Sequence, residues 1–231
     1  MNCRHCGAPV DSVFVDLGSS PPSNAYLSQV GLEHPETWYP LRVLVCESCW
    51  LVQTEDFAAA SDLFDAEYAY FSGFSSSWVD HCSTYAATMA GRFELGAEST
   101  VLEVASNDGT LLRFFADRGM SCVGIEPTAS TAEAARGLGL QVVEEFLSVE
   151  LADRLVAGGL RADLLAANNV VAHVPDILDF VTACGRLLKA GGVATFEFPH
   201  VLQLVDQNQF DTIYHEHFSY LSLSAVERVF E

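Results

Sequence analysis

The residues best suited to chemistry lie near the end of the chain, where Tyr214, Glu216 and His217 place a phenol, a carboxylate and an imidazole within four positions. This set could remove a proton next to a carbonyl group, because histidine is a base near neutral pH and glutamate could orient it or move a second proton. The tyrosine could donate to the enolate oxygen that develops. His173 could complete the set from another segment. Two other interpretations stay open: His215, Glu216 and His217 could bind a metal, although they lack the H-E-x-x-H spacing, and each histidine could be only a structural hydrogen-bonding group.

Four of the seven cysteines form two C-x-x-C pairs, Cys3 with Cys6 and Cys46 with Cys49. Two such pairs supply the four thiolates that zinc prefers in closed, tetrahedral structural sites. A redox dithiol is the main alternative, but one C-x-x-C at a helix start would suffice for it. We therefore expect a structural zinc ion and assign no chemistry to the other three cysteines.

A strand, an acidic turn and the start of a helix are predicted over residues 101–112, and a second strand over 122–125 ends in Glu126-Pro127. Glu126 follows Glu103 by 23 residues. An acidic residue that closes the second strand of such a unit typically holds an adenosine ribose. The turn lacks the G-x-G-x-x-G of pyrophosphate sites, so it suits a cofactor with a cationic end, such as S-adenosylmethionine. The alternative is an ordinary strand–helix unit without a ligand.

These residues need a scaffold, and the alternation of strand and helix patterns predicts a parallel sheet flanked by helices. The carboxyl ends of such strands open onto the ligand crevice, where we expect the segments 168–175 and 210–220. The predicted strands are 100–105, 121–126, 141–143, 163–168 and 192–198, and the predicted helices are 109–118, 129–138, 148–158 and 176–189.

Composition limits the function further, because 11 basic against 31 acidic residues give the 231-residue chain a net charge of −20. This charge argues against binding to nucleic acid or to anionic membranes. No signal peptide or membrane-spanning apolar run is visible, so we expect a cytoplasmic protein. The expected segments are a zinc-binding module at 1–56, connecting helices with an aromatic and serine-rich loop at 57–94, and a cofactor-binding domain at 95–231. Within the second segment we expect a short helix at 57–64 and a longer one at 78–93.

The order of these motifs resembles one known family. An amino-terminal Cys₄ module, an aromatic and serine-rich loop, Glu-x-Ala-Ser-Asn-Asp-Gly, Ala-Asn-Asn-Val-Val-Ala-His-Val and Phe-Asp-Thr-Ile-Tyr-His-Glu-His-Phe-Ser-Tyr occur here in sequence. Together they resemble the S-adenosylmethionine-dependent sugar C-methyltransferases, which make branched deoxysugars for antibiotic glycosides. The likeness covers essentially the whole chain, and the last motif is the most specific. It implies a doubly wound, Rossmann-like class I methyltransferase domain preceded by the zinc module.

The resemblance also implies a reaction and a set of residues. The substrate would be a nucleotide-linked 4-keto-6-deoxysugar, usually carried on dTDP, methylated at C3 through an enolate. His217 and Tyr214 match the candidate base and enolate partner, Glu216 and His173 match accompanying polar residues, and Tyr68 matches an aromatic near the active site. The positions that match cofactor contacts, with Glu126 on the ribose hydroxyls and Asn168 near the methionine end, are Glu103, Ser106, Asn107, Gly109, Glu126, Pro127 and Asn168.

Family members carry a further α/β domain that helps to bind the nucleotide, and we expect that domain to be absent from this chain, which ends at Glu231. Compared with methyltransferases in general, Ala105 and Asn107 stand where glycines are frequent. The alternatives are a sugar O- or N-methyltransferase on the same fold, which needs no enolising base, and a zinc-bearing scaffold without activity. The oligomeric state is not readable from the sequence.

Overall fold

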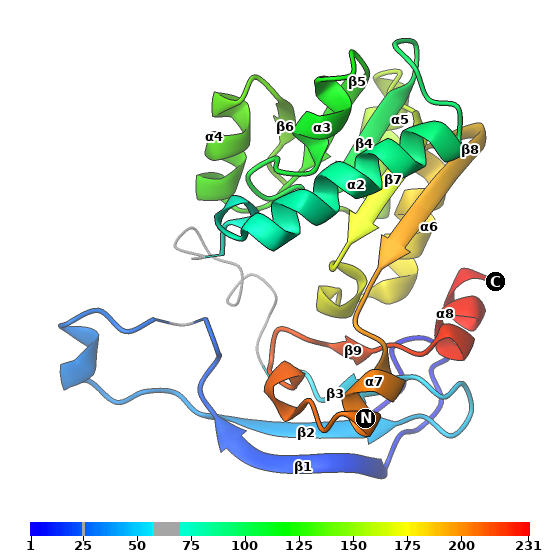
Figure 1. Ribbon diagram of the computed structural model, residues 1–231. Helices are drawn as coiled ribbons and strands as arrows, with labels where there is room; N and C mark the ends of the chain where they lie inside the picture. Colours follow the sequence, from blue (N-terminus) through cyan, green and yellow to red (C-terminus); the bar gives the residue numbers. More distant parts are fainter. Residues whose placement is uncertain (25, 58–69) are drawn as a thin grey trace. The chain divides into compact units, whose positions relative to one another are not determined.

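The computed structural model describes the chain except for residues 25 and 58–69 (Figure 1). Residues 58–64 of the expected helix at 57–64, and Tyr68, therefore lie outside the described residues. The chain divides into two packing units. Unit 1 comprises residues 1–65, 169–181 and 198–231, and unit 2 comprises residues 66–168 and 182–197. The expected segment boundaries at 56 and 94 stay predictions.

Unit 2 is built on a five-stranded parallel sheet in the order β6-β5-β4-β7-β8, as the alternating pattern predicts. The strand order reverses beside β4, which pairs with β5 on one side and β7 on the other. Ligands of doubly wound sheets bind at such a switch point, beyond the carboxyl ends of the strands. The strands are β4 (Thr100–Val104), β5 (Ser121–Ile125), β6 (Gln141–Val143), β7 (Ala162–Asn168) and β8 (Leu188–Glu197).

Two helices of this part of the chain begin after a serine whose hydroxyl caps the first turn, Ser75 and Ser148. Helix α2 (Ser76–Arg92) confirms the predicted helix at 78–93; the Ser75 hydroxyl accepts a hydrogen bond from the Trp78 amide. Its inner face buries Cys82, Tyr85 and Ala86 in the same core as α3 and strands β4 and β7. The remaining helices of unit 2 are α3 (Leu112–Ala116), α4 (Ala129–Gly137) and α5 (Val149–Ala157). Helix α6 (Ile177–Leu187) begins in unit 1 and ends in unit 2.

One expected boundary is wrong. The sequence predicts a helix to residue 189 that ends at Gly191-Gly192, whereas the chain is already in β8 from Leu188. Gly192 lies so close to the Ala162 carbonyl that a Cβ there would come within 2.7 Å of the oxygen. Gly191-Gly192 therefore does not end a helix. The absence of a side chain at Gly192 permits the close approach of β8 to β7 at the register shift after Ala162.

Unit 1 contains a four-stranded antiparallel sheet in the order β1-β2-β3-β9. Its first three strands come from the amino-terminal region, but the fourth follows directly after the Tyr214–Phe218 segment. Tyr220 pairs with Val52, and Ser219 pairs with Gln53. The strands are β1 (Ser12–Ser20), β2 (Tyr39–Val45), β3 (Val52–Thr54) and β9 (Ser219–Tyr220).

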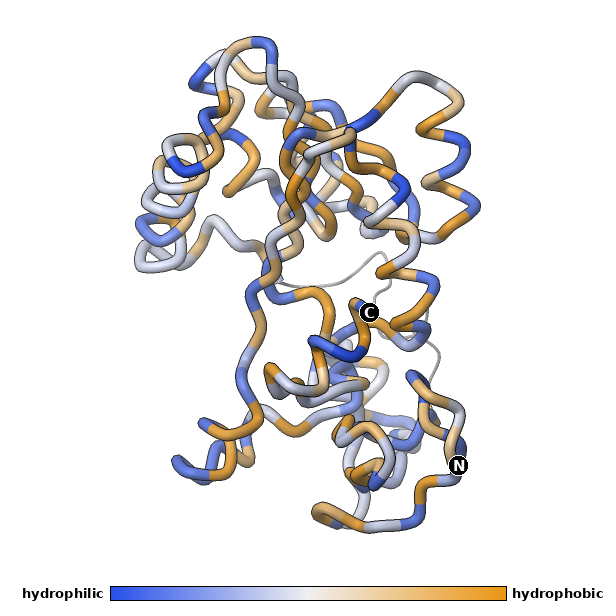
Figure 2. Tube along the Cα trace, turned by 90° about the vertical axis from the view of Figure 1, so that its right-hand side faces the viewer, coloured by the Kyte–Doolittle hydropathy of each residue, from blue (hydrophilic) through white to orange (hydrophobic). Residues whose placement is uncertain are grey.

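Short helices complete unit 1, with a small core that joins Leu41 and Val43 of β2 to Leu204, Ile213 and Tyr220. Figure 2 shows hydrophobic residues running through the traces of both units, with hydrophilic residues between them. None of the helices in the described ranges is long and apolar enough to cross a membrane. The short helices are η1 (Gly31–Glu33), η3 (Val171–His173), α7 (Val201–Asp206), η4 (Phe210–Thr212) and α8 (Leu223–Phe230), and η2 (Ser72–Phe74) belongs to unit 2.

Candidate functional site

The four predicted zinc ligands converge. The Sγ atoms of Cys3, Cys6, Cys46 and Cys49 all lie within 4.8 Å of one another. Cys3 is 3.5 Å from Cys49 and Cys6 is 3.6 Å from Cys46, sulfur to sulfur. Zinc–sulfur bonds of about 2.3 Å in a tetrahedron separate the sulfurs by about 3.8 Å, so this set fits a closed Cys₄ zinc site.

The thiols also have the polar surroundings of a metal site. Burial raises the pKa of the Cys3 thiol, but neighbouring backbone N–H groups and the Gln53 side chain outweigh it, so the pKa falls to about 7. Gln53 is fully buried and donates to the Cys3 sulfur at 3.3 Å. Its Oε1 accepts a hydrogen bond from the Arg4 amide at 3.0 Å. The cysteine cluster is thereby bound to strand β3.

The predicted cofactor turn follows β4 in unit 2. Ala105 and Asn107 adopt left-handed backbone conformations, with φ of 55° and 50°, in the positions where glycine would be the ordinary choice. At Gly109 a Cβ would come within 2.4 Å of the Leu140 side chain. At Gly124 of β5 it would meet the Ser106 hydroxyl at 2.3 Å. The turn is therefore packed directly against the second strand.

The two acidic residues of the motif lie together at the carboxyl ends of β4 and β5. The Glu126 carboxylate is almost fully buried and accepts hydrogen bonds from the amides of Asn107, at 2.8 Å, and Thr128, at 3.0 Å. Each of its oxygens keeps a second lone pair, as a partner of ribose hydroxyls would need. Burial, reinforced by the charge of Glu126, raises the pKa of Glu103 well above its usual range.

Two buried polar atoms at this turn have no hydrogen-bond partner within the described part of the chain, Oε2 of Glu103 and Oγ of Ser106. Such atoms are rare in folded proteins and point to a polar ligand. Pro127 follows Glu126 directly, and Asn168 ends β7 at the same edge of the sheet, paired with Glu197. These residues are the candidate cofactor cradle, and the buried polar groups of Glu103, Ser106 and Glu126 fit the chemistry of S-adenosylmethionine.

The aromatic and serine-rich loop is attached to the same turn. The Asn107 side chain accepts from the Ser72 amide at 2.9 Å and donates to the Tyr70 carbonyl at 3.0 Å. Asp108 accepts from the Gly73 amide at 2.8 Å. The sequence interpretation did not assign a role to Asp108, and its place in an acidic turn was the only available signal.

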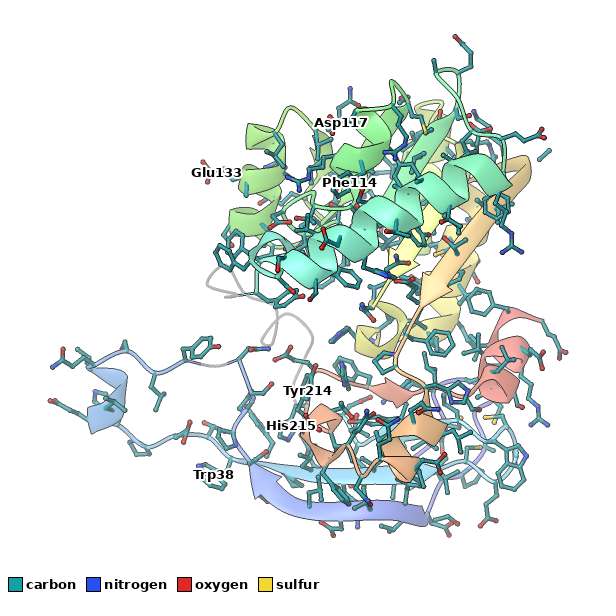
Figure 3. All side chains as sticks on the ribbon, in the orientation of Figure 1. Trp38, Phe114, Asp117, Glu133, Tyr214 and His215 are labelled. Carbon is teal, nitrogen blue, oxygen red and sulfur yellow. The ribbon has the colours of Figure 1, made fainter. Side chains whose placement is uncertain are left out.

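The candidate catalytic residues gather in unit 1, in the segment between α7 and β9 where Figure 3 labels Tyr214 and His215. The Tyr214 hydroxyl lies 2.9 Å from Nε2 of His217, and Nδ1 of His217 lies 2.8 Å from the Thr212 carbonyl oxygen. A carbonyl oxygen only accepts, so Nδ1 carries the proton and Nε2 is the basic nitrogen. Tyr214 therefore donates to that nitrogen.

His173 joins this pair from η3. Its ring lies 4.5 Å from the His217 ring, centroid to centroid, and its Nδ1 donates to the Glu216 carbonyl oxygen at 2.9 Å. Burial lowers the pKa of His217. Burial and the neighbouring His217 lower the pKa of His173 to about 3. Both rings are therefore neutral near pH 7, the form in which histidine accepts a proton.

Glu216 is adjacent to His217 in the sequence, but its side chain forms hydrogen bonds with a different segment of unit 1. It is 1% exposed, and its carboxylate accepts hydrogen bonds from Ser23 and Asn24, both from the loop after β1. His215 bonds the Pro40 carbonyl at 3.1 Å and packs edge-on against Tyr39. Within the described residues the ligand atoms of this segment do not converge as a metal site requires.

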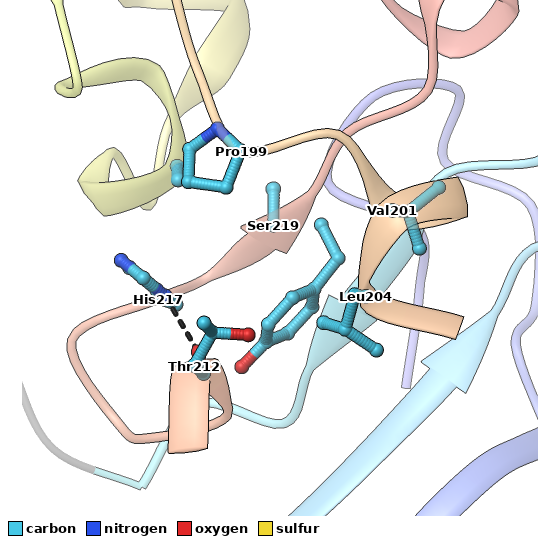
Figure 4. A pocket seen from close by; sticks show the side chains of 8 residues that line it. Pro199, Val201, Leu204, Thr212, His217 and Ser219 are labelled. Carbon is cyan, nitrogen blue, oxygen red and sulfur yellow. Dashed lines mark hydrogen bonds between the residues drawn. The ribbon is translucent and has the colours of Figure 1, made fainter. Parts of the chain in front are cut away.

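A small cavity of about 10 Å³ lies beside His217 (Figure 4). That is about the space of one water molecule. Its lining is mostly apolar, and within the described chain the Ser219 and Tyr220 hydroxyls at its wall have no hydrogen-bond partner. The lining residues are Ala172, Pro199, Val201, Leu204, Thr212, His217, Ser219 and Tyr220.

Comparison with protein families gives one match in the amino-terminal region and one in the rest of the chain. Residues 3–64 match a family described as a zinc binding domain, and residues 80–231 match one described as a methyltransferase domain. The chain belongs to the methyltransferase family. The resemblance seen in the sequence is thereby confirmed at the level of the methyltransferase domain, its zinc module and its cofactor class.

Individual proteins that are similar to this chain are also methyltransferases. It is 31% identical to the C-methyltransferase NovU of Streptomyces niveus over 99% of its own length and 54% of the relative's. A ubiquinone biosynthesis O-methyltransferase of Chelativorans is 33% identical, over 40% of this chain and 37% of the relative. The chain thus spans about half the length, or less, of these relatives. A solved S-adenosylmethionine-dependent methyltransferase from Archaeoglobus fulgidus shares the fold, with a TM-score of 0.51, 15% identity and coverage of 64% and 66% of the two chains.

Substitution of Glu126 tests the cofactor cradle. Glu126→Ala removes the acceptor for two backbone amides and for the ribose hydroxyls, so we expect the Kd for S-adenosylmethionine to rise about 10- to 100-fold, as hydrogen bonds to charged groups imply. Isothermal titration calorimetry measures this, and Glu133→Ala on the exposed face of α4 is the matched control. Equal affinity in Glu126→Ala and the wild type would refute the assignment of the ribose site.

Proposed function

We propose that the protein catalyses C-methylation of a dTDP-linked 4-keto-6-deoxysugar at C3, with S-adenosylmethionine as methyl donor and an enolate as intermediate. The observation that carries this proposal is the Tyr214–His217 pair. In it a neutral imidazole is oriented by the Thr212 carbonyl and receives a phenol hydroxyl on its basic nitrogen. Transfer of a methyl group to oxygen or nitrogen does not need an enolising base of this kind.

In the proposed reaction the ketone at C4 acidifies the C3–H bond. His217 removes that proton onto Nε2, and the electron pair of the C–H bond moves into the enolate. Tyr214 then donates its hydroxyl hydrogen bond to the enolate oxygen, where negative charge develops. S-Adenosylmethionine supplies an electrophilic methyl group on its sulfonium, and C3 of the sugar takes this methyl group in place of its proton.

The proposal assigns donor binding to unit 2 and proton removal to unit 1. Glu103, Glu126 and Ser106 would hold the donor, with Asn107, Gly109 and Pro127 shaping the turn and Asn168 near the methionine end. The relatives support carbon as the methylated atom: the C-methyltransferase NovU matches 99% of this chain, whereas the O-methyltransferase of Chelativorans matches 40% of it. Tyr68 remains a proposed active-site aromatic.

The test is incubation of the protein with labelled S-adenosylmethionine and a dTDP-4-keto-6-deoxysugar in D₂O, followed by NMR. We expect deuterium at C3 without the donor and a C3 methyl group with it. If the methyl group appears on an oxygen or nitrogen and C3 keeps its proton, the enolate proposal is wrong and the O- or N-methyltransferase alternative holds.

A further inference from the structure

A loop after β1, within the expected zinc-binding module at 1–56, contacts the candidate active site within unit 1. Strand β1 ends at Ser20, which pairs with Tyr39 of β2, and Pro21-Pro22 lead from it to Ser23 and Asn24. Proline fixes its own φ angle, so this lead retains little conformational freedom. The loop is therefore suited to hold a side chain in a fixed place.

The contact between this loop and Glu216 is specific. Asn24 Nδ2 donates to both carboxylate oxygens of Glu216, at 2.7 and 2.9 Å, and the Ser23 hydroxyl donates to Oε1 at 3.1 Å. The amide must present its nitrogen, because its oxygen would repel a carboxylate. Because Glu216 is 1% exposed, water cannot hydrogen-bond its carboxylate, and the donors of Asn24 and Ser23 take the place of that water.

The backbone of Glu216 connects the hydrogen bonds of Asn24 and Ser23 to the candidate base. Its carbonyl oxygen accepts the Nδ1–H of His173, and this bond leaves Nε2 as the basic nitrogen of that ring. His217 is the next residue along the chain. A carboxylate fixed at Glu216 therefore fixes the peptide that orients one histidine and carries the other.

We propose that Asn24, assisted by Ser23, is a positioning residue for the active site: it holds the Glu216 carboxylate in one orientation and stabilises its charged form. The catalytic part of this inference rests on the proposed function. The zinc-binding region thereby contributes a side chain, as well as stability, to the reaction.

The sign of the expected pH effect follows from the groups around Glu216. Burial raises the pKa of Glu216, and the donors of Asn24 and Ser23 oppose it. The titratable neighbours of Glu216 on its own segment are Tyr214, His215 and His217, and His173 on η3 bonds its backbone carbonyl. Burial lowers the pKa of His173 and His217, so those two histidines are neutral. Loss of the amide donor should therefore raise the pKa of Glu216.

The experiment compares the full chain with Asn24→Ala, Asn24→Asp and Ser23→Ala, and uses Gln207→Ala, an exposed amide in the same unit, as control. The Glu216 carboxyl is titrated directly by ¹³C NMR with labelled glutamate, its signal assigned by Glu216→Gln. We expect an upward pKa shift of about one unit in Asn24→Ala, a larger one in Asn24→Asp, where two carboxylates face each other, and a smaller one in Ser23→Ala. The acid limb of kcat for methyl transfer should move by the same amount, and the control should match the wild type.

An unchanged Glu216 titration in Asn24→Ala and Ser23→Ala, with zinc content and melting temperature preserved, would overturn the proposal. If the wild type fails to exchange or methylate C3, the proposed function fails, while the NMR titration still reports whether Asn24 stabilises the charged carboxylate. If the carboxyl shifts but the acid limb of kcat does not, the positioning role in catalysis is refuted.

Discussion

His217→Ala is expected to reduce both methyl transfer and solvent exchange at C3 strongly, with kcat lower by about 10²- to 10⁴-fold, the usual contribution of a positioned general base. The expectation rests on the state of the ring: Nδ1 is bound to the Thr212 carbonyl and Nε2 faces the Tyr214 hydroxyl. Removal of the ring leaves the phenol without an acceptor and C3 without a base. Single-turnover methyl transfer and deuterium exchange measure the two losses separately.

Three further variants keep this result interpretable. His217→Phe retains a ring of similar size without its nitrogens, so an equal loss of activity excludes a simple packing defect. Tyr214→Phe removes only the hydroxyl and should reduce kcat less, by about tenfold, the worth of one neutral hydrogen bond, because the base remains. His34→Ala, an exposed histidine of the same unit, should behave as wild type. Cofactor affinity should be unchanged in all, and normal turnover by His217→Ala would eliminate His217 as the base.

The candidate cofactor cradle could be picked out from the sequence because its residues are local in sequence. A strand, a turn and a helix follow one another, and the acidic residue that ends the next strand lies in the adjacent strand of a parallel sheet. The register that pairs Glu103 with Gly124 places Glu126 beside the turn. Ala105 and Asn107 could not be predicted in left-handed conformations, since non-glycine residues avoid them unless the surroundings impose them.

The rest of the candidate active site depends on contacts between distant segments, which no periodicity reports. Asn24 and Glu216 are 192 positions apart, and their hydrogen bonds exist only because both belong to unit 1. The pairing of β9 with β3 is of the same kind, because a strand of two residues has too little pattern to predict. The direction of a side chain could not be predicted from the sequence either. The sequence placed Glu216 with His217, whereas its carboxylate is hydrogen-bonded to Asn24 and Ser23.

The zinc site leads to the second large effect. Cys46→Ser should lower bound zinc well below one equivalent, because serine does not replace a thiolate in a Cys₄ site. Structural zinc contributes a large part of the folding free energy of small modules. We therefore expect the melting temperature of unit 1 to fall by on the order of 10 °C or more. Metal analysis and calorimetry measure both changes, and Cys122→Ser, a partly buried cysteine of unit 2, is the matched control.

Loss of zinc should also reduce methyl transfer, although none of the four cysteines is expected to touch a substrate. The Cys3 sulfur is bound to Gln53, and the next residue, Thr54, donates from its hydroxyl to the His217 carbonyl at 3.1 Å and from its amide to the Phe218 carbonyl at 3.1 Å. Hydrogen exchange of residues 214–220 should therefore increase in Cys46→Ser, while the affinity for S-adenosylmethionine should stay unchanged, because the candidate cofactor cradle belongs to unit 2. Full turnover by a zinc-free protein would show that the catalytic segment is held by the sheet alone.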